Sequence, residues 1–197
     1  MNYNKAKFEK ACGVASQLPA PQGSEIVFCG KSNVGKSSLL NKLFSRKALA
    51  KVSAVPGKTI TINFYDVDGV KFVDLPGYGY AKISKSEKAR FSALIETYFQ
   101  SKRPVRLVVV LIDMRHPPTA GDLDMLHYVQ ETEMPYIVVL TKSDKLNKTE
   151  YKARLNSLPG ELGCPESVAV IAASSKNGQG IDEIKQHIET AVELSLI

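Results

Sequence analysis

Short apolar segments bounded by Gly, Pro or Asp alternate along this 197-residue chain with longer amphipathic stretches. Such alternation is typical of repeated strand–helix units rather than of a helical bundle or a strand sandwich. The segment 107–112 contains no polar residue, as expected of a strand buried on both faces of a parallel sheet. The pattern predicts strands at 25–30, 61–67, 70–75, 106–113, 136–141 and 168–173, and helices at 35–45, 85–102, 119–131, 148–157 and 180–194.

One pair of these strands is antiparallel, because only Asp68 and Gly69, which favour a two-residue hairpin turn, separate the second strand from the third. The other strands are joined through helices and run parallel. The predicted fold is therefore a three-layer α/β domain over residues 24–197. It has a six-stranded, mostly parallel sheet with one antiparallel strand and helices on both faces. We expect residues 1–23 to form an N-terminal arm and linker, either a flexible tail or a packing strand.

Charge and composition narrow the class of protein. The 26 Lys and Arg residues exceed the 20 Asp and Glu residues, so the formal net charge of +6 suggests an acidic partner such as nucleic acid, nucleotide or lipid headgroup. No apolar run approaches the roughly 18 residues of a membrane span, and the first ten residues are too polar for a secretory signal. We therefore expect a cytoplasmic protein. Cys12, Cys29 and Cys164 have no CxxC spacing and are expected to be reduced and packed, not zinc ligands.

A glycine-rich turn follows the first predicted strand. The sequence GKSNVGKS at 30–37 matches GxxxxGK[ST] between an apolar strand and a helix, a context in which a chance match is improbable. Backbone N–H groups of such a loop and the positive end of the helix dipole bind phosphate, Lys36 reaches the β- and γ-phosphates, and the Ser37 hydroxyl is a ligand for Mg²⁺. The predicted phosphate-binding residues are Gly30, Lys31, Ser32, Asn33, Val34, Gly35, Lys36, Ser37 and Ser38.

The base is predicted from a second motif, TKSD at 141–144, which follows the fifth strand. The Asp144 carboxylate can accept from N1–H and the 2-amino group of guanine, whereas adenine offers neither donor. Lys142 would lay its methylene stem over the base. Taken alone, an exposed ion pair would explain this motif, and its position after a strand is what favours the guanine site. The predicted base-binding residues are Thr141, Lys142, Ser143 and Asp144, with Ser174, Ser175 and Lys176 after the sixth strand donating backbone N–H groups to guanine O6.

A third motif, DxxG, ends the third strand as Asp74, Leu75, Pro76 and Gly77. Asp74 is expected to hold Mg²⁺ through water, and the Gly77 N–H to donate to a γ-phosphate oxygen. The last Mg²⁺ ligand is expected from the loop at 47–59. There Thr59, after Gly57 and Lys58, is preferred to Thr61, which begins a strand. Together these motifs, each at the carboxyl end of a strand, predict a Ras-like P-loop GTPase fold.

The chain also resembles a known family. The stretches at 30–41, 56–59, 74–81 and 112–118 are similar to those of the EngB/YsxC (YihA) group of bacterial ribosome-assembly GTPases, which belongs to the translation-factor-related class. The resemblance covers about Ser24 to the C-terminus, and its most specific part is the Tyr-Gly-Tyr-Ala extension at 78–81. It implies that Ser37 and Thr59 are Mg²⁺ ligands. It further implies a role in maturation of the large ribosomal subunit that is needed for growth and linked to cell division.

Two residues depart from the small signalling GTPases. Tyr78 stands where a water-orienting glutamine is usual, so we expect slow intrinsic hydrolysis, with Lys36, Thr59, Gly77 and Asn33 as the catalytic groups. Asn33 resembles the asparagine that helps to hold K⁺ in potassium-activated GTPases, and K⁺ would supply part of the charge that an arginine finger provides. An asparagine that only favours the turn is an equally good explanation of this position.

Basic residues flank the two loops that contact the γ-phosphate. They are Arg46, Lys47, Lys51 and Lys58 beside the first loop, and Lys82, Lys85, Lys88 and Arg90 after DxxG. Lysine-rich surfaces are usually only solvated, but this clustering favours contact with rRNA phosphates in the GTP-bound form. The expected partners are GTP and GDP, the large-subunit precursor with its rRNA and ribosomal proteins, and no second copy of the chain.

Some alternatives remain open at this point. A signalling or division-septum switch that binds only proteins predicts no RNA contact, and an ATP-dependent kinase predicts competition by adenine nucleotides. Tyr78 and Tyr80 could stack on bases or pack the loop, and the roles of Arg115 and His116 are not assigned.

Overall fold

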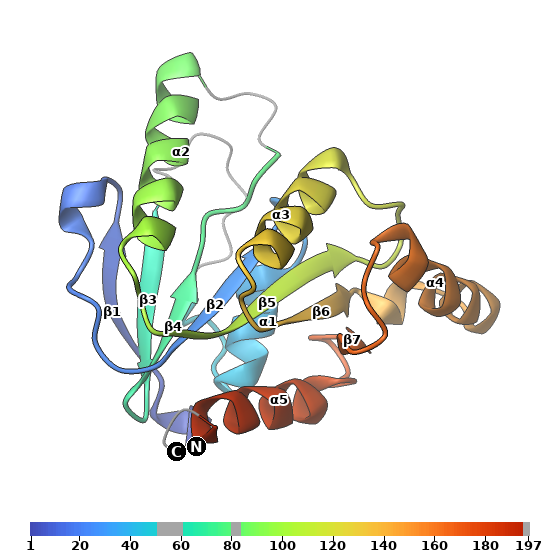
Figure 1. Cartoon of the computed structure of the whole chain (residues 1–197). Helices are drawn as coiled ribbons and strands as arrows, with labels where there is room; N and C mark the ends of the chain where they lie inside the picture. Colours follow the sequence, from blue (N-terminus) through green and yellow to red (C-terminus); the bar gives the residue numbers. More distant parts are fainter. Residues whose placement is uncertain (51–60, 80–83, 195–197) are drawn as a thin grey trace.

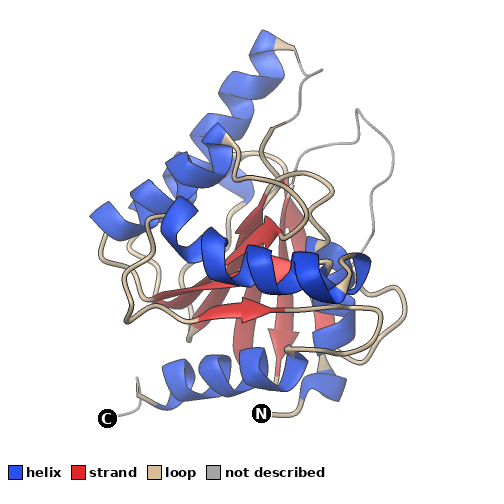
Figure 2. Ribbon diagram, turned by 90° about the vertical axis from the view of Figure 1, so that its right-hand side faces the viewer, coloured by secondary structure: helices blue, strands red, loops and turns tan. Residues whose placement is uncertain are grey.

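A seven-stranded sheet forms the middle layer of the computed structural model, which describes residues 1–50, 61–79 and 84–194 (Figures 1 and 2). The strand order is β1-β3-β4-β2-β5-β6-β7. The strands are β1 (Lys7–Cys12), β2 (Glu25–Gly30), β3 (Ile62–Val67), β4 (Val70–Asp74), β5 (Val105–Asp113), β6 (Tyr136–Thr141) and β7 (Val170–Ala172). The helices are α1 (Lys36–Leu43), α2 (Lys85–Gln100), α3 (Ala120–Glu131), α4 (Lys148–Glu161) and α5 (Ile181–Glu193), with 3-10 turns η1 (Tyr3–Lys5), η2 (Ala15–Gln17) and η3 (Ser143–Lys145).

The sheet is covered on both faces, which explains its apolar strands. Leu40 of α1 and Ile184 of α5 belong to the core on one face, whereas Leu94 of α2, Leu126 of α3 and Leu158 of α4 belong to the core on the other. Alternate residues of each central strand point into opposite cores, as the pleat requires. The predicted α/β architecture, with helices on both faces of a mostly parallel sheet, is confirmed.

The predicted strand count of six is wrong by one. The additional strand, β1, lies in the segment expected to be an arm and pairs antiparallel with β3, from Lys7 opposite Asp66 to Cys12 opposite Ile62. Because β1 is an edge strand whose residues are exposed up to Cys12, it lacks the apolar run that marks the other strands. As predicted, β3 runs antiparallel to its neighbours, β1 and β4. The turn from β3 into β4 has positive φ at Asp68 (56°) and Gly69 (89°), as a primed hairpin turn requires.

A buried ion pair fixes the start of β2. The Glu25 side chain is 1% exposed and accepts from Arg103 Nε at 3.0 and 2.9 Å and from Tyr98 Oη at 2.6 Å. Arg103 Nη1 also donates to the Pro19 carbonyl at 3.0 Å, so the linker before β2 is held against the C-terminal end of α2. These contacts anchor β2, the strand that leads into the glycine-rich loop.

The three cysteines are unpaired and differ in burial. Cys12 and Cys29 are buried and Cys164 is half-buried, and all three are free thiols. In the described ranges, no helix is both long enough and apolar enough to cross a membrane.

Candidate nucleotide-binding site

The glycine-rich loop connects β2 to α1 and presents free backbone donors. Gly35 caps α1 with φ of 107°, a left-handed conformation that favours glycine, and its carbonyl accepts the first helical bond from Leu39. Within residues 1–50, 61–79 and 84–194, no protein group accepts from the backbone N–H of Lys36 or Ser37. Unpaired N–H groups at the positive end of a helix dipole form an anion site, so this loop is suited to phosphate.

Two carbonyl oxygens of the same loop accept from the last residue of β6 and from the residue after it. Thr141 Oγ1 donates to the Val34 carbonyl at 2.6 Å, and Lys142 Nζ donates to the Asn33 carbonyl at 2.6 Å. These bonds hold two of the loop's carbonyl oxygens on this side, while the N–H groups of Lys36 and Ser37 on the other side are left for a ligand. Residues that are more than a hundred positions apart in the chain thus form one site.

The structure also brings together the two segments predicted to bind the base. Asp144 Oδ1 accepts from Ser174 Oγ at 2.7 Å, and Ser174 Oγ accepts from the backbone N–H of Lys176 at 3.2 Å. The Asp144 carboxylate is therefore held in a fixed orientation beside the loop that carries Ser174, Ser175 and Lys176.

Lys36 and Asp74 form an ion pair, in which Lys36 Nζ donates to Asp74 Oδ1. Asn63 Nδ2 donates to the other carboxylate oxygen of Asp74 at 3.4 Å. A phosphate would compete with Asp74 for Lys36, and a divalent cation would compete with Lys36 for Asp74. Both predicted groups are thus present at the glycine-rich loop.

The donor set fits Mg²⁺. The Ser37 hydroxyl and the Asp74 carboxylate supply oxygen ligands, which this ion prefers, and Mg²⁺ is usually held by one or two protein oxygens together with phosphates and water. No cluster of three or more His, Cys, Asp or Glu residues that could hold a metal is found in the described part of the chain. The predicted site residues Gly57, Lys58 and Thr59 lie outside the described residues, as do Lys51, Tyr80 and Lys82.

Asp113, at the carboxyl end of β5, is a site residue that the sequence analysis missed. Its carboxylate accepts from Lys142 Nζ at 2.8 Å and from Arg115 Nε and Nη2 at 2.9 and 2.8 Å. Burial alone would raise the pKa of Asp113, but hydrogen bonds from Arg115 and Lys142 outweigh it and lower that pKa. Asp113 thereby holds Lys142 beside the loop, and this pairing accounts for Arg115. The sequence did carry a signal for Asp113, because it ends a predicted strand at the same sheet edge as Gly30 and Thr141.

Tyr78 faces α3. Its hydroxyl donates to Asp122 Oδ1 at 2.8 Å, and its ring lies against Gly121. In this arrangement Tyr78 packs its loop and does not offer its ring for base stacking, which answers the question that the sequence left open for this residue.

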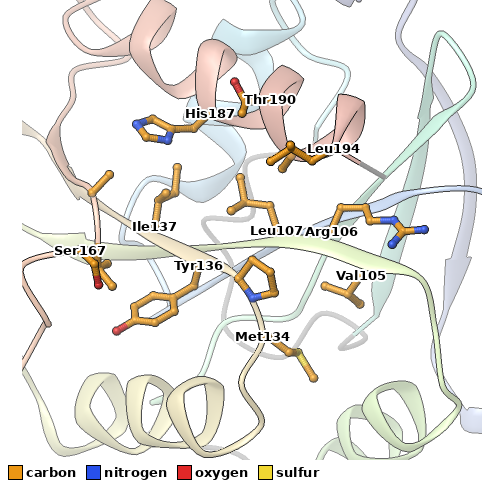
Figure 3. Close-up of a pocket in the computed structure, with 14 residues that line it drawn as sticks. Val105, Arg106, Leu107, Met134, Tyr136, Ile137, Ser167, His187, Thr190 and Leu194 are labelled. Atoms are coloured by element: carbon orange, nitrogen blue, oxygen red, sulfur yellow. The ribbon is translucent and has the colours of Figure 1, made fainter. Parts of the chain in front are cut away.

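Two hollows in the surface differ in the polarity of the side chains that line them. One hollow, of about 730 Å³, lies where β5 and β6 begin, beside α5, and is lined mainly by apolar residues such as Leu107, Ile137 and Leu194 (Figure 3). It contains no predicted site residue, and it lies at the start of the strands instead of their carboxyl ends. A hollow of about 440 Å³ adjoins Ser38 and Ser175 and is lined by basic side chains, those of Lys42, Arg46 and Lys47.

Comparison with known proteins gives the family. The model of the 50S ribosome-binding GTPase family matches residues 25–142. A probable GTP-binding protein EngB of Lacticaseibacillus casei (strain BL23) is 43% identical over 195 residues, which are 98% of each chain. The EngB protein of Kosmotoga olearia is 44% identical over 185 residues, covering 93% of this chain and 97% of that one.

Solved structures have the same fold. A crystal structure of a probable GTP-binding protein engB superimposes with a TM-score of 0.73 at 24% identity, covering 86% of this chain and 98% of that chain. Era in complex with MgGDPNP and nucleotides of 16S ribosomal RNA has a TM-score of 0.60 at 23% identity, covering 85% of this chain and 56% of that one. The glycine-rich loop, DxxG and TKSD therefore lie in a Ras-like P-loop GTPase domain. Because it is more than 40% identical to these relatives over nearly its whole length, the chain belongs to the EngB family of GTP-binding proteins, which bind GTP and GDP and hydrolyse GTP.

Proposed function

We propose that this GTPase is a nucleotide-dependent switch in assembly of the large ribosomal subunit, needed for normal growth and cell division. The observation that supports this most strongly is the match of residues 25–142 to the 50S ribosome-binding GTPase model. In the proposal, the GTP-bound protein binds the subunit precursor through rRNA and ribosomal proteins, and hydrolysis releases it. The protein acts as a monomer in the cytoplasm, where these subunits are assembled.

The basic hollow beside the nucleotide site supports contact with RNA. Lys42, Arg46 and Lys47 line it, and no carboxylate among the described residues forms an ion pair with any of them. The Arg46 guanidinium donates to a neutral acceptor, the Asn4 carbonyl oxygen, at 3.0 Å. Cations without acidic partners keep their charge available for phosphates. Since Ser38 and Ser175 line the same hollow, a phosphate bound there would lie next to the nucleotide.

The roles assigned to the nucleotide site belong to the same proposal. Lys36 and the loop N–H groups hold the β- and γ-phosphates, Gly77 N–H donates to the γ-phosphate, and Asp144 reads guanine. Ser37, Thr59 and, through water, Asp74 hold Mg²⁺, which would neutralise charge on the phosphates.

We also propose that Asn33 helps to bind K⁺ beside the phosphates. Asn33 has a φ of 64° and an exposed side chain, which could reach a cation but equally suits a turn. GTPase rates measured with ribosomal subunits in matched K⁺ and Na⁺ buffers distinguish these roles. The proposal expects a higher rate in K⁺, and equal rates would refute it.

The RNA contact is tested by the salt dependence of binding to large ribosomal subunits. Each lost phosphate contact should reduce the slope of log affinity against log salt by about 0.7 to 0.9, so exchanging Lys42, Arg46 and Lys47 for Gln should reduce it by about 2 to 3. A control that exchanges the exposed Lys10, Lys148 and Lys152 for Gln removes the same charge elsewhere. A switch that binds only proteins predicts a shallow slope and equal effects of the two triple variants.

A further inference from the structure

We propose that Tyr78 is a positioning residue for GTP hydrolysis: through its hydroxyl bond to Asp122 of α3, it holds the DxxG segment against the glycine-rich loop. Gly77, the residue before it, is thereby kept where its N–H meets the γ-phosphate. The inference rests on the proposed role of Gly77.

The backbone of Tyr78 pairs with the glycine-rich loop on both sides. Its N–H donates to the Gly30 carbonyl at 3.3 Å, and its carbonyl accepts from the Ser32 N–H at 2.9 Å and from Ser32 Oγ at 3.1 Å. These bonds extend the parallel pairing of β4 with β2 beyond the end of β4. Tyr78 is therefore a fixed point directly after Gly77.

Gly77 is pressed against the same loop. A Cβ atom at Gly77 would lie 2.9 Å from both the N and the Cα atom of Ser32, closer than non-bonded atoms approach. On the other side of Gly77, the Leu75 N–H donates to the Phe28 carbonyl at 3.0 Å. The segment is thus pinned at both ends, so that a small displacement of Tyr78 would move the Gly77 N–H relative to the phosphate loop.

The side chain of Tyr78 provides the anchor for this fixed point. The Asp122 carboxylate is 4% exposed and uses both oxygens: Oδ1 accepts from Tyr78 Oη at 2.8 Å, and Oδ2 accepts from the N–H and the hydroxyl of Thr119 at 2.8 and 2.6 Å. Burial, with the nearby negative charge of Asp122, raises the pKa of Tyr78, so its hydroxyl remains a donor at physiological pH. A hydrogen bond to a buried carboxylate is among the stronger ones in proteins.

Gly121 leaves room for the aromatic ring. A Cβ atom at this position would lie 3.0 Å from Tyr78 Cδ2, so the ring rests directly on the first turn of α3. With its hydroxyl bound to Asp122 and its ring on α3, the Tyr78 side chain is turned to the helix and does not orient the attacking water. Tyr78 therefore acts on the reaction through Gly77.

The test is single-turnover GTP hydrolysis by the full-length chain, together with the affinities for GTP and GDP and the urea unfolding curve. Tyr78→Phe removes one oxygen and keeps the ring. We expect the hydrolysis rate to fall about tenfold, the order expected for one lost hydrogen bond to a charged group, while GDP affinity changes less than twofold. The matched control is Tyr136→Phe, at the opposite end of the sheet, where the hydroxyl accepts from Gln130 at 2.9 Å. That control should leave the rate unchanged.

Gly121→Ala separates positioning from stability. Alanine favours helix more than glycine does, but its methyl group would lie 3.0 Å from the ring, which must move. The hydrolysis rate should therefore fall by more than any loss of folded protein in the urea curve. A Tyr78→Phe rate within twofold of the natural protein, or rate losses that only follow the folded fraction, would overturn the proposal. Gly77→Ala identifies where a failure lies. If it abolishes hydrolysis with GDP affinity and stability unchanged while Tyr78→Phe does not, the role of Gly77 stands and the Tyr78 proposal fails. If it has no effect, both fail.

Discussion

Exchanging Asp144 for Asn probes how this GTPase selects its base. Asp144 Oδ1 accepts from Ser174 Oγ at 2.7 Å, so the carboxylate proposed to bind guanine is held in one orientation. In Asp144→Asn an NH₂ group replaces one carboxylate oxygen and opposes the donors of guanine. Two hydrogen bonds to a charged group are lost. At the lower value of about 1.5 kcal/mol for each, the cost is about 3 kcal/mol, or roughly 150-fold in Kd.

The assay is competition of GDP and XDP against a fluorescent GDP analogue. We expect the variant to bind GDP roughly 150-fold more weakly and to gain affinity for XDP, because the 2-carbonyl of xanthine accepts from the new amide. Asp124→Asn, an exposed position on α3, removes the same charge and should change neither affinity. GDP affinity within threefold of the natural protein in Asp144→Asn would refute the assignment of Asp144 to the base.

Three further predictions concern the phosphate site and the stability of the fold. Lys36→Ala should lower GTP affinity by roughly two orders of magnitude and leave guanosine affinity unchanged in the same assay; equal losses for both would contradict the phosphate role. Arg103→Met leaves the Glu25 carboxylate buried without its cation, so urea unfolding should show a free energy of unfolding lower by about 3 to 5 kcal/mol. A loss below about 1 kcal/mol would contradict a stabilising role for this ion pair. Because the pKa of Asp113 is lowered in the folded state, its contribution to stability is complete above the unfolded value of about 4 and is lost as pH falls towards the folded value. Melting temperatures of Asp113→Asn should therefore fall less steeply below pH 4 than those of the natural protein.

The strands that are easiest to predict from the sequence are those covered by helices on both faces of the sheet. β2, β5 and β6 lie in the middle of the sheet, so their apolar runs are visible without any knowledge of the fold. β1 has exposed residues up to Cys12 and exists because it pairs with β3, an interaction between segments some 55 residues apart that no local pattern reveals.

One helix also continued beyond its predicted end. The predicted helix ended at Ser157, two residues before Pro159, which lacks an N–H and disfavours a helical conformation in the residue before it. The structure continues the helix to Glu161, with Leu158 buried against the sheet and the following Leu162 also buried. Packing of these side chains outweighs the cost of the proline.

The candidate site was predictable where its residues form a contiguous motif at the end of a strand. The loop at 30–37, DxxG and TKSD all lie at the expected sheet edge. The contacts that hold these motifs in place were missed, because they join distant segments: Asp113 to Lys142, and Tyr78 to Asp122, which are 44 residues apart. Such supporting residues have no spacing signature, and only the fold brings them together.

The central claim is that GTP controls binding to the large ribosomal subunit, and co-sedimentation with purified subunits tests it most directly. The protein would be compared with GDP, with a non-hydrolysable GTP analogue and without nucleotide, over a series of salt concentrations. We expect binding with the GTP analogue alone, and we expect that binding to weaken steeply as the salt concentration rises. Equal sedimentation with GDP and the GTP analogue, or none with either, would contradict it.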